Sequence, residues 1–218
     1  MPLYTIREEN ANTLTHAVGV FFGVGVTIYF IFNSVSIQNY WLAISTLLYA
    51  ICMTFSFLTS TVYHAEKSAS RKHFLRKFDH AAIYLHIAGS YTPFTLVVLR
   101  NEGYWGWSLF VVIWLAAIAG VVLSFTRIKN AEKVETACFV AMGWVVLFAF
   151  KPLIDVLTTA DAMLIFWWLV AGGVFYTLGA IIYLLKRIEF MHAVWHIFVL
   201  FGSICHAIAI GLIKTKFI

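Results

Sequence analysis

Apolar residues fall into seven long runs along the chain, separated by short stretches that hold most of the charged and turn-forming residues. Each run is about 20 residues or longer, which is enough for one helix to cross a hydrocarbon core about 30 Å thick. The chain shows no internal repeat and no connecting stretch long enough for a second domain. The pattern therefore predicts an all-α integral membrane protein, a single domain over residues 1–218. Its seven transmembrane helices are expected at about 13–34, 41–64, 79–99, 104–126, 134–154, 161–185 and 190–213.

Composition agrees with this pattern. Of all residues, 62% are hydrophobic and only 11% are charged, and the mean hydropathy is +0.88. A soluble domain carries roughly 25% charged residues, so this composition excludes soluble globular, disordered, collagen-like and nucleic-acid-binding proteins. The three cysteines, Cys52, Cys138 and Cys205, lie inside apolar runs without metal-knuckle spacing. We interpret them as small buried hydrophobic residues.

The lysines and arginines predict the direction of the chain, because cytoplasmic loops of membrane proteins are enriched in them. With the N-terminus inside, the inner segments hold most of them: Arg7, Lys67, Arg71, Lys72, Arg76, Lys77, Arg127, Lys129, Lys133, Lys186 and Arg187. The outer segments hold Arg100, Lys151, Lys214 and Lys216. We therefore predict a cytoplasmic N-terminus and a C-terminus on the outer side.

Ionisable residues collect at the predicted cytoplasmic ends of four helices. His16 begins the first helix, His64 ends the second, Asp79 begins the third, and His192 and His196 begin the seventh. An ionisable group inside a membrane span is energetically costly, and it therefore indicates a functional site. We expect these four helices to line one cavity that opens to the cytoplasm, with leucine, phenylalanine and tryptophan side chains facing lipid.

Three of these histidines form a predicted zinc site. His192 and His196 are one helical turn apart, and His64 from another helix completes a set of three imidazoles. Three nitrogen ligands with an open fourth position are typical of catalytic zinc. Asp79 at the same depth is expected to orient the bound water. The alternative is that the H-x3-H pair makes only hydrogen bonds between helices.

Other polar residues allow two interpretations. His86 and His206 lie deeper in their helices, where they are either proton-relay or substrate-contact groups or simply buried hydrogen-bonding histidines. Asn12 is a suitable N-cap, which would leave Glu9 outside the first helix. Glu9, Asn12 and His16 either touch the site or only brace this helix against it, and the capping role of Asn12 favours bracing.

Glycine, proline and histidine residues elsewhere in the chain predict local features of the fold. Gly19 and Gly23 form a GxxxG step, which predicts close packing of two helices. Pro93 is expected to kink the third helix. His73 lies in a basic stretch that we interpret as a solvated loop.

Four segments of the chain resemble the hemolysin III group, the bacterial branch of the progestin and adipoQ receptor family. Glu9-x2-Asn12-x3-His16 is similar to the N-terminal motif of that family. Ser60-x3-His64 and His192-x3-His196 are similar to its S-x3-H and H-x3-H motifs, and residues 78–94 resemble its third helix.

The resemblance implies a seven-helix fold with an intracellular N-terminus, in the cytoplasmic membrane of a bacterium. It implies a zinc ion near the inner leaflet, held by His64, His192 and His196, with Ser60 and Asp79 beside it. A wider similarity to alkaline ceramidases implies a metal-dependent membrane hydrolase that acts on lipid amides.

The sequence thus favours a zinc-dependent hydrolase of a lipid amide or ester, with a membrane lipid as its partner. In this mechanism Asp79 is the general base and Ser60 hydrogen-bonds the developing oxyanion. Two other classes stay open. One is a receptor-like regulator of membrane homeostasis with a structural zinc, and the other is a pore-forming or haemolytic protein that uses Asp79, His86 and His206 as a relay.

Overall fold

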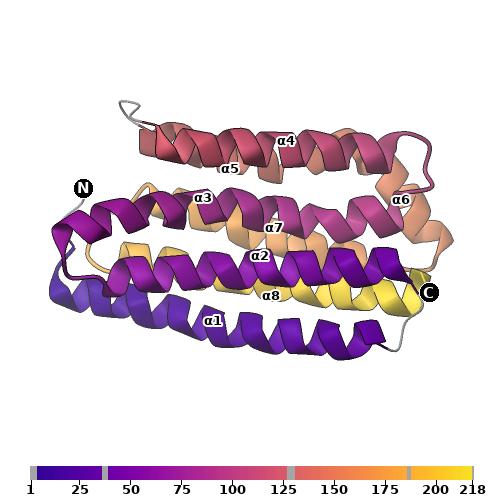
Figure 1. The fold of residues 1–218 in the computed structure, drawn as a ribbon. Helices are drawn as coiled ribbons and strands as arrows, with labels where there is room; N and C mark the ends of the chain where they lie inside the picture. The colour runs from indigo at the N-terminus through magenta and orange to yellow at the C-terminus, as the bar shows by residue number, and fades with distance from the viewer. Residues whose placement is uncertain (1–3, 36–38, 127–130, 186–187, 218) are drawn as a thin grey trace.

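Long helical segments run along one axis of the molecule in the computed structural model of the chain, each membrane-crossing segment antiparallel to the next one in the sequence (Figure 1). The structure describes residues 4–35, 39–126, 131–185 and 188–217. All regular secondary structure in these ranges is helical. The α-helices are α1 (Ile6–Val35), α2 (Tyr40–Ala65), α3 (Ala69–Pro93), α4 (Trp105–Phe125), α5 (Ala131–Gly143), α6 (Phe150–Thr159), α7 (Met163–Tyr183) and α8 (Met191–Phe217). A π-helical turn, η1 (Phe94–Val98), extends α3, and a 3-10 turn, η2 (Val145–Ala149), joins α5 to α6.

Seven helical segments in the described ranges are long and apolar enough to cross a membrane. They cover Ile6–Asn33, Tyr40–Ala65, Ala69–Val98, Trp105–Phe125, Val134–Thr159, Met163–Tyr183 and Met191–Phe217. Each overlaps one of the seven apolar runs, so the prediction of an all-helical protein with seven such segments is confirmed. The two chain ends lie at opposite ends of the bundle (Figure 1), as an odd number of crossings requires.

The first helix begins earlier than its apolar run predicts, because a capping box starts it. Thr5 Oγ1 accepts a hydrogen bond from the backbone N–H of Glu8 at 3.2 Å, and the Thr5 N–H donates to Glu8 Oε2 at 2.8 Å. This reciprocal pair satisfies the free N–H groups of the first turn. Asn12 is therefore an interior residue of α1, and the prediction that it caps the helix and leaves Glu9 outside is wrong.

The third helix also begins about three turns before its apolar run. Residues 69–78 are basic and include only a few apolar side chains, so hydropathy alone gave no helix there. Charged residues are nevertheless good helix formers when the helix end lies in water. His73 therefore lies on a helix and not in a loop, although its side chain is exposed as expected.

Successive helices pack against each other, and α1 also packs against α8, which closes the ring. Short connections favour this antiparallel arrangement. The GxxxG step lies at one of these contacts: a Cβ on Gly19 would overlap the Phe57 ring, and one on Gly23 would lie 2.5 Å from Thr54 Oγ1. The predicted close packing is confirmed, and α2 is the partner helix.

The π-helical turn η1 follows directly on Pro93, where a kink was expected. Proline has no N–H to continue the regular ladder, and the chain instead closes an i to i+5 hydrogen bond from Leu99 N to Phe94 O at 2.8 Å. The irregularity therefore takes the form of a wider turn that continues the third membrane segment to Val98.

The outer surface of the bundle is apolar. Large hydrophobic side chains on it are exposed, among them Phe21 on α1, Leu115 on α4 and Trp167 on α7. This surface suits contact with lipid and not with water. Cys52 and Cys205 are buried as expected, whereas Cys138 is only half-buried.

Candidate metal centre

The structure brings His64, His192 and His196 together at the end of the bundle where the chain begins. All three are buried, and one ring nitrogen of each lies within 4.8 Å of the others. The two Nε2 atoms of His64 and His192 are 3.2 Å apart. Tetrahedral zinc with Zn–N bonds of about 2.0–2.1 Å needs nitrogens about 3.3 Å apart. The cluster is thus close to the geometry of a metal centre and can hold a metal ion.

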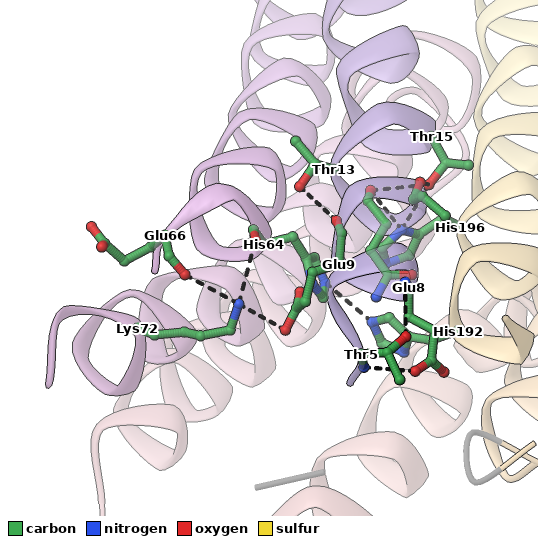
Figure 2. A network of polar contacts seen from close by, with 12 residues as sticks. Thr5, Glu8, Glu9, Thr13, Thr15, His64, Glu66, Lys72, His192 and His196 are labelled. Carbon is green, nitrogen blue, oxygen red and sulfur yellow. Dashed lines mark hydrogen bonds and ion pairs between the residues drawn. The ribbon is translucent and has the colours of Figure 1, made fainter. Parts of the chain in front are cut away.

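His64 is oriented by a carboxylate from α1. Its Nδ1 lies 2.7 Å from Glu9 Oε2, and Glu9 Oε1 lies 2.8 Å from Lys72 Nζ on α3 (Figure 2). Lys72 Nζ also donates to the carbonyl oxygens of His64 at 3.3 Å and Glu66 at 3.4 Å. The Glu66 carboxylate, outside the membrane segments, is bound by Arg71, whose hydrogen bonds hold the pKa of that carboxyl below its usual value.

His196 is oriented by the backbone and a hydroxyl of α1. Its Nδ1 lies 3.3 Å from the Asn12 carbonyl oxygen and 3.1 Å from Thr15 Oγ1. The Thr15 hydroxyl donates to backbone carbonyls of its own helix. The His196 Nε2 is buried and has no hydrogen-bond partner within the described ranges. A histidine that donates through Nδ1 presents its Nε2 lone pair to a metal.

A fourth imidazole lies behind this cluster. The ring of His16 stacks on that of His196, with 3.5 Å between the centroids, and meets Phe57 edge-on. Neither ring nitrogen of His16 has a hydrogen-bond partner in the part of the chain that the structure describes, and the same holds for the side-chain amide of Asn12. Glu9, Asn12 and His16 therefore surround the site, which corrects the expectation that favoured bracing alone.

The start of α1 is tied to the start of α8 through the same capping residue. Glu8 Oε1 accepts a hydrogen bond from the backbone N–H of Phe190 at 3.4 Å. Phe190 has a positive φ of 63° and directly precedes α8. This contact joins the turn that carries Glu9 to the helix that carries His192 and His196.

A cavity of about 300 Å³ runs from the histidine end into the centre of the bundle. His16, Asp79 and His192 line one end of it, and mostly apolar side chains such as Phe94 and Phe150 line the rest, together with a few polar ones that include His86 and His206. Four helices were predicted to form its wall by their polar stripes. The structure adds residues of α5, η2, α6 and α7, so apolar faces from most of the bundle complete the cavity.

The two predicted catalytic residues lie differently with respect to this cavity. Asp79 is buried and lines it together with His192. Ser60 is buried one turn before His64, and its hydroxyl has no hydrogen-bond partner among the described residues. Ser60 does not line the cavity wall. The structure thus brings the three histidines together and places both residues in the same part of the bundle.

A second histidine–carboxylate pair lies beside Asp79, with a half-buried histidine and a buried glutamate. His80 Nδ1 is 2.6 Å from Glu135 Oε2 on α5, and Ser124 Oγ on α4 donates to Glu135 Oε1 at 2.9 Å. Three helices are thereby joined at the end of the bundle that holds the histidines. His80 on α3 therefore contacts a neighbouring helix, α5.

The sequence analysis did not predict two contacts of the site, those of Glu9 with His64 and of Lys72 with Glu9. The signal for Glu9 was present in the sequence, since Thr5 and Glu8 form a T-x-x-E capping box that places Glu9 inside the helix. Glu9 also shares a helix face with His16. No comparable signal existed for Lys72, which belongs to a run of basic residues and reaches Glu9 only because α3 begins early.

Comparison with known proteins identifies the family. The model of the haemolysin-III related family matches residues 4–207. The chain belongs to this family. It is 36% identical to the hemolysin-3 homolog of Bacillus subtilis (strain 168) over 201 residues, which are 92% of each chain. It is also 36% identical to hemolysin-3 of Bacillus cereus over 198 residues, 91% of this chain and 88% of that protein.

The family extends to animals. The chain is 30% identical over 178 residues to the human monocyte to macrophage differentiation factor, covering 78% of this chain and 70% of the human protein. The matched region of the family model contains all three clustered histidines, as well as Glu9 and Asp79. The resemblance noted from the motifs is confirmed, and this family member is a multi-pass membrane protein with bacterial relatives.

Proposed function

We propose that this protein is a zinc-dependent hydrolase that cleaves a lipid amide or ester near the inner leaflet of a bacterial cytoplasmic membrane. The observation that carries the proposal is the location of the three-imidazole cluster. His192, one of the three clustered histidines, lines one end of a largely apolar cavity, and Asp79 is on the wall of the same cavity. A zinc ion held by the three histidines would therefore lie next to the acyl chain of a lipid bound in this cavity.

The donor set supports zinc. All three ligands are imidazole nitrogens, which suit zinc and leave a position for water or substrate. Structural zinc sites are usually closed by a fourth ligand, often cysteine. The three cysteines of the chain are not part of the cluster.

The charge distribution supports a cytoplasmic location of the histidine end. Arg7, Lys72 and Lys77 lie at the end of the bundle where the chain begins, and Lys214 and Lys216 lie at the other end. Arg127, Lys129, Lys186 and Arg187 lie outside the described residues. An excess of basic residues at the histidine end favours the cytoplasm.

The mechanism assigns separate tasks to the metal and to Asp79. Bound zinc supplies a Lewis acid that polarises the substrate carbonyl and makes water more acidic. Asp79 accepts a proton from the attacking water and returns it to the leaving amine or alcohol. Ser60 lies outside the cavity wall, and the mechanism therefore assigns it no contact with the substrate. The water oxygen bonds to the carbonyl carbon, the C–N or C–O bond breaks, and a fatty acid is released.

The test combines metal content with turnover. Detergent-purified protein is analysed for zinc beside a triple variant, His64→Ala, His192→Ala and His196→Ala, and beside His73→Ala, which changes an exposed histidine. We expect about one zinc per chain in the wild type and in His73→Ala, and none in the triple variant. Each protein is then incubated with a ceramide and with a fatty acyl ester, and released fatty acid is measured by mass spectrometry.

The outcomes separate the three functional classes. Fatty acid release by the wild type that is lost in the triple variant supports the hydrolase. Full zinc occupancy without release from any acyl amide or ester contradicts it and favours a structural zinc. Ion flux through proteoliposomes that hold the purified protein would instead indicate a pore.

A further inference from the structure

Two histidines lie midway along the cavity, away from the metal centre. His86 on α3 and His206 on α8 both line the cavity wall. Seven residues separate Asp79 from His86, and ten separate His196 from His206. At 1.5 Å per helical residue, the two rings lie about 10–15 Å deeper than the metal centre.

Both imidazoles keep unused hydrogen-bonding capacity in this apolar environment. The Nε2 atom of His86 and the Nδ1 atom of His206 are buried, and neither has a hydrogen-bond partner in the described part of the chain. Buried polar groups in native proteins are nearly always hydrogen-bonded. Two ring nitrogens without a partner on the wall of one cavity therefore indicate that a ligand or a water molecule forms hydrogen bonds with them.

The hydroxyl groups around these rings are already engaged. The Tyr176 ring lies near both imidazoles, with its centroid 6.3 Å from that of His86 and 5.2 Å from that of His206. Ser203 Oγ donates to a carbonyl of its own helix, so the Tyr176 hydroxyl, 3.0 Å away, donates to Ser203. The Tyr49 hydroxyl donates to the Ser203 carbonyl oxygen at 3.0 Å. These groups fix the tyrosines in place, and they leave His86 Nε2 and His206 Nδ1 without a partner among the described residues.

The helices make specific room for these rings. A Cβ on Gly172 would lie 2.6 Å from His206 Nε2, and a Cβ on Gly202 would lie 2.8 Å from the Tyr176 ring. The glycines at positions 172 and 202 thus leave space in the α7–α8 contact for the His206 and Tyr176 rings beside the cavity. An alanine at position 172 would force His206 to move.

The ligand group that fits is a neutral hydroxyl. Asp79 is the one Asp, Glu, Lys or Arg among the described residues of the cavity wall, and it lies at the metal end. A charged group would therefore find no counter-charge beside His86 and His206. A neutral imidazole carries one N–H and one lone pair, so two rings can offer a donor and an acceptor. A hydroxyl group can accept a hydrogen bond from the N–H of one ring and donate one to the lone pair of the other.

We propose that His86 and His206 form a second subsite, which binds a hydroxyl group carried in the middle of the acyl chain of a lipid. The subsite rests on the proposed function, in which the cavity holds an acyl chain whose carbonyl lies at the metal centre. It makes the cavity selective for hydroxylated chains, because a plain chain leaves both imidazoles unsatisfied.

The experiment compares two fatty acids that differ only in one mid-chain hydroxyl group. Binding to the protein in lipid nanodiscs is measured by isothermal titration calorimetry. We expect the wild type to bind the hydroxylated acid roughly threefold to tenfold more tightly. His86→Leu, His206→Leu and Gly172→Ala are each expected to reduce this ratio toward one. The exposed histidine variant His73→Leu is the matched control and keeps the ratio.

Each outcome distinguishes the subsite from the proposed function. Equal affinity of the wild type for the two acids overturns the subsite but leaves the lipid cavity in place. Binding of neither acid overturns both. A preference that persists in His86→Leu and His206→Leu places the hydroxyl elsewhere and overturns the subsite. If the leucine variants do not fold, His86→Phe and His206→Phe replace them, because phenylalanine keeps a planar ring without hydrogen-bonding nitrogens. A preference that persists in both phenylalanine variants likewise overturns the subsite.

Discussion

Glu9 Oε2 lies 2.7 Å from His64 Nδ1, so a carboxylate near the start of α1 orients a histidine near the end of α2. The other nitrogen of His64 faces His192 at 3.2 Å. This is the arrangement in which a carboxylate sets the tautomer and the ring orientation of a metal-binding histidine. Lys72 completes it, because its ammonium group contacts the second oxygen of Glu9 at 2.8 Å.

Replacing Glu9 by alanine is expected to weaken metal binding about 10–100-fold without removing a ligand, because His64 loses the group that orients it. Zinc affinity is measured by competition with a chromophoric chelator. The matched control is Glu66→Gln, since Glu66 contacts Arg71 and its side chain does not contact the cluster. Equal zinc affinity in Glu9→Ala and the wild type would show that the carboxylate has no such role.

Asp79→Asn is expected to abolish hydrolysis while one zinc per chain stays bound. The amide has the size of the carboxylate but cannot accept a proton from water. Zinc content and fatty acid release are measured on the same preparation, and a loss of at least 100-fold in turnover is expected. A variant that turns over normally would remove Asp79 from the mechanism, and one that loses its zinc would make it a structural residue.

The ion pair of His80 and Glu135 is expected to stabilise the bundle and not to bind metal. Glu135→Gln leaves His80 without its charged partner, which costs about 1.5–3 kcal/mol and lowers the unfolding temperature in detergent by roughly 3–12 °C. Zinc content should stay at the wild-type level. The exposed Glu102→Gln is the control, with an unchanged unfolding temperature. An equal effect of both substitutions would argue against a specific contribution of the pair.

Gly106→Ala is expected to destabilise the contact between α4 and η1. A Cβ at this position would lie 2.5 Å from the Thr95 carbonyl oxygen and 2.6 Å from that of Leu99. Backbone atoms cannot move aside as a side chain can, so overpacking costs about 1–3 kcal/mol. Gly25→Ala is the matched control, because its Cβ would meet nothing within 4 Å. Thermal unfolding in detergent should therefore shift downward for Gly106→Ala only.

Much of the architecture was determined by the sequence alone. Seven apolar runs of membrane-crossing length correspond to the seven helical segments, because backbone groups in lipid must be hydrogen-bonded within a helix. The H-x3-H spacing and the position of His64 were sufficient to predict the histidine cluster, since helical periodicity and the cost of burying ionisable groups are local properties.

The tertiary structure decided which side chains meet. The contact of Glu9 with His64, the pairing of His80 with Glu135, and the cavity wall that holds His86 and His206 all join separate helices. Such contacts depend on how each helix is rotated and how closely it packs against its neighbours. Hydropathy along one chain does not contain that information, because many rotations bury similar apolar area. Packing of particular side chains, such as His206 against Gly172, selects one of them.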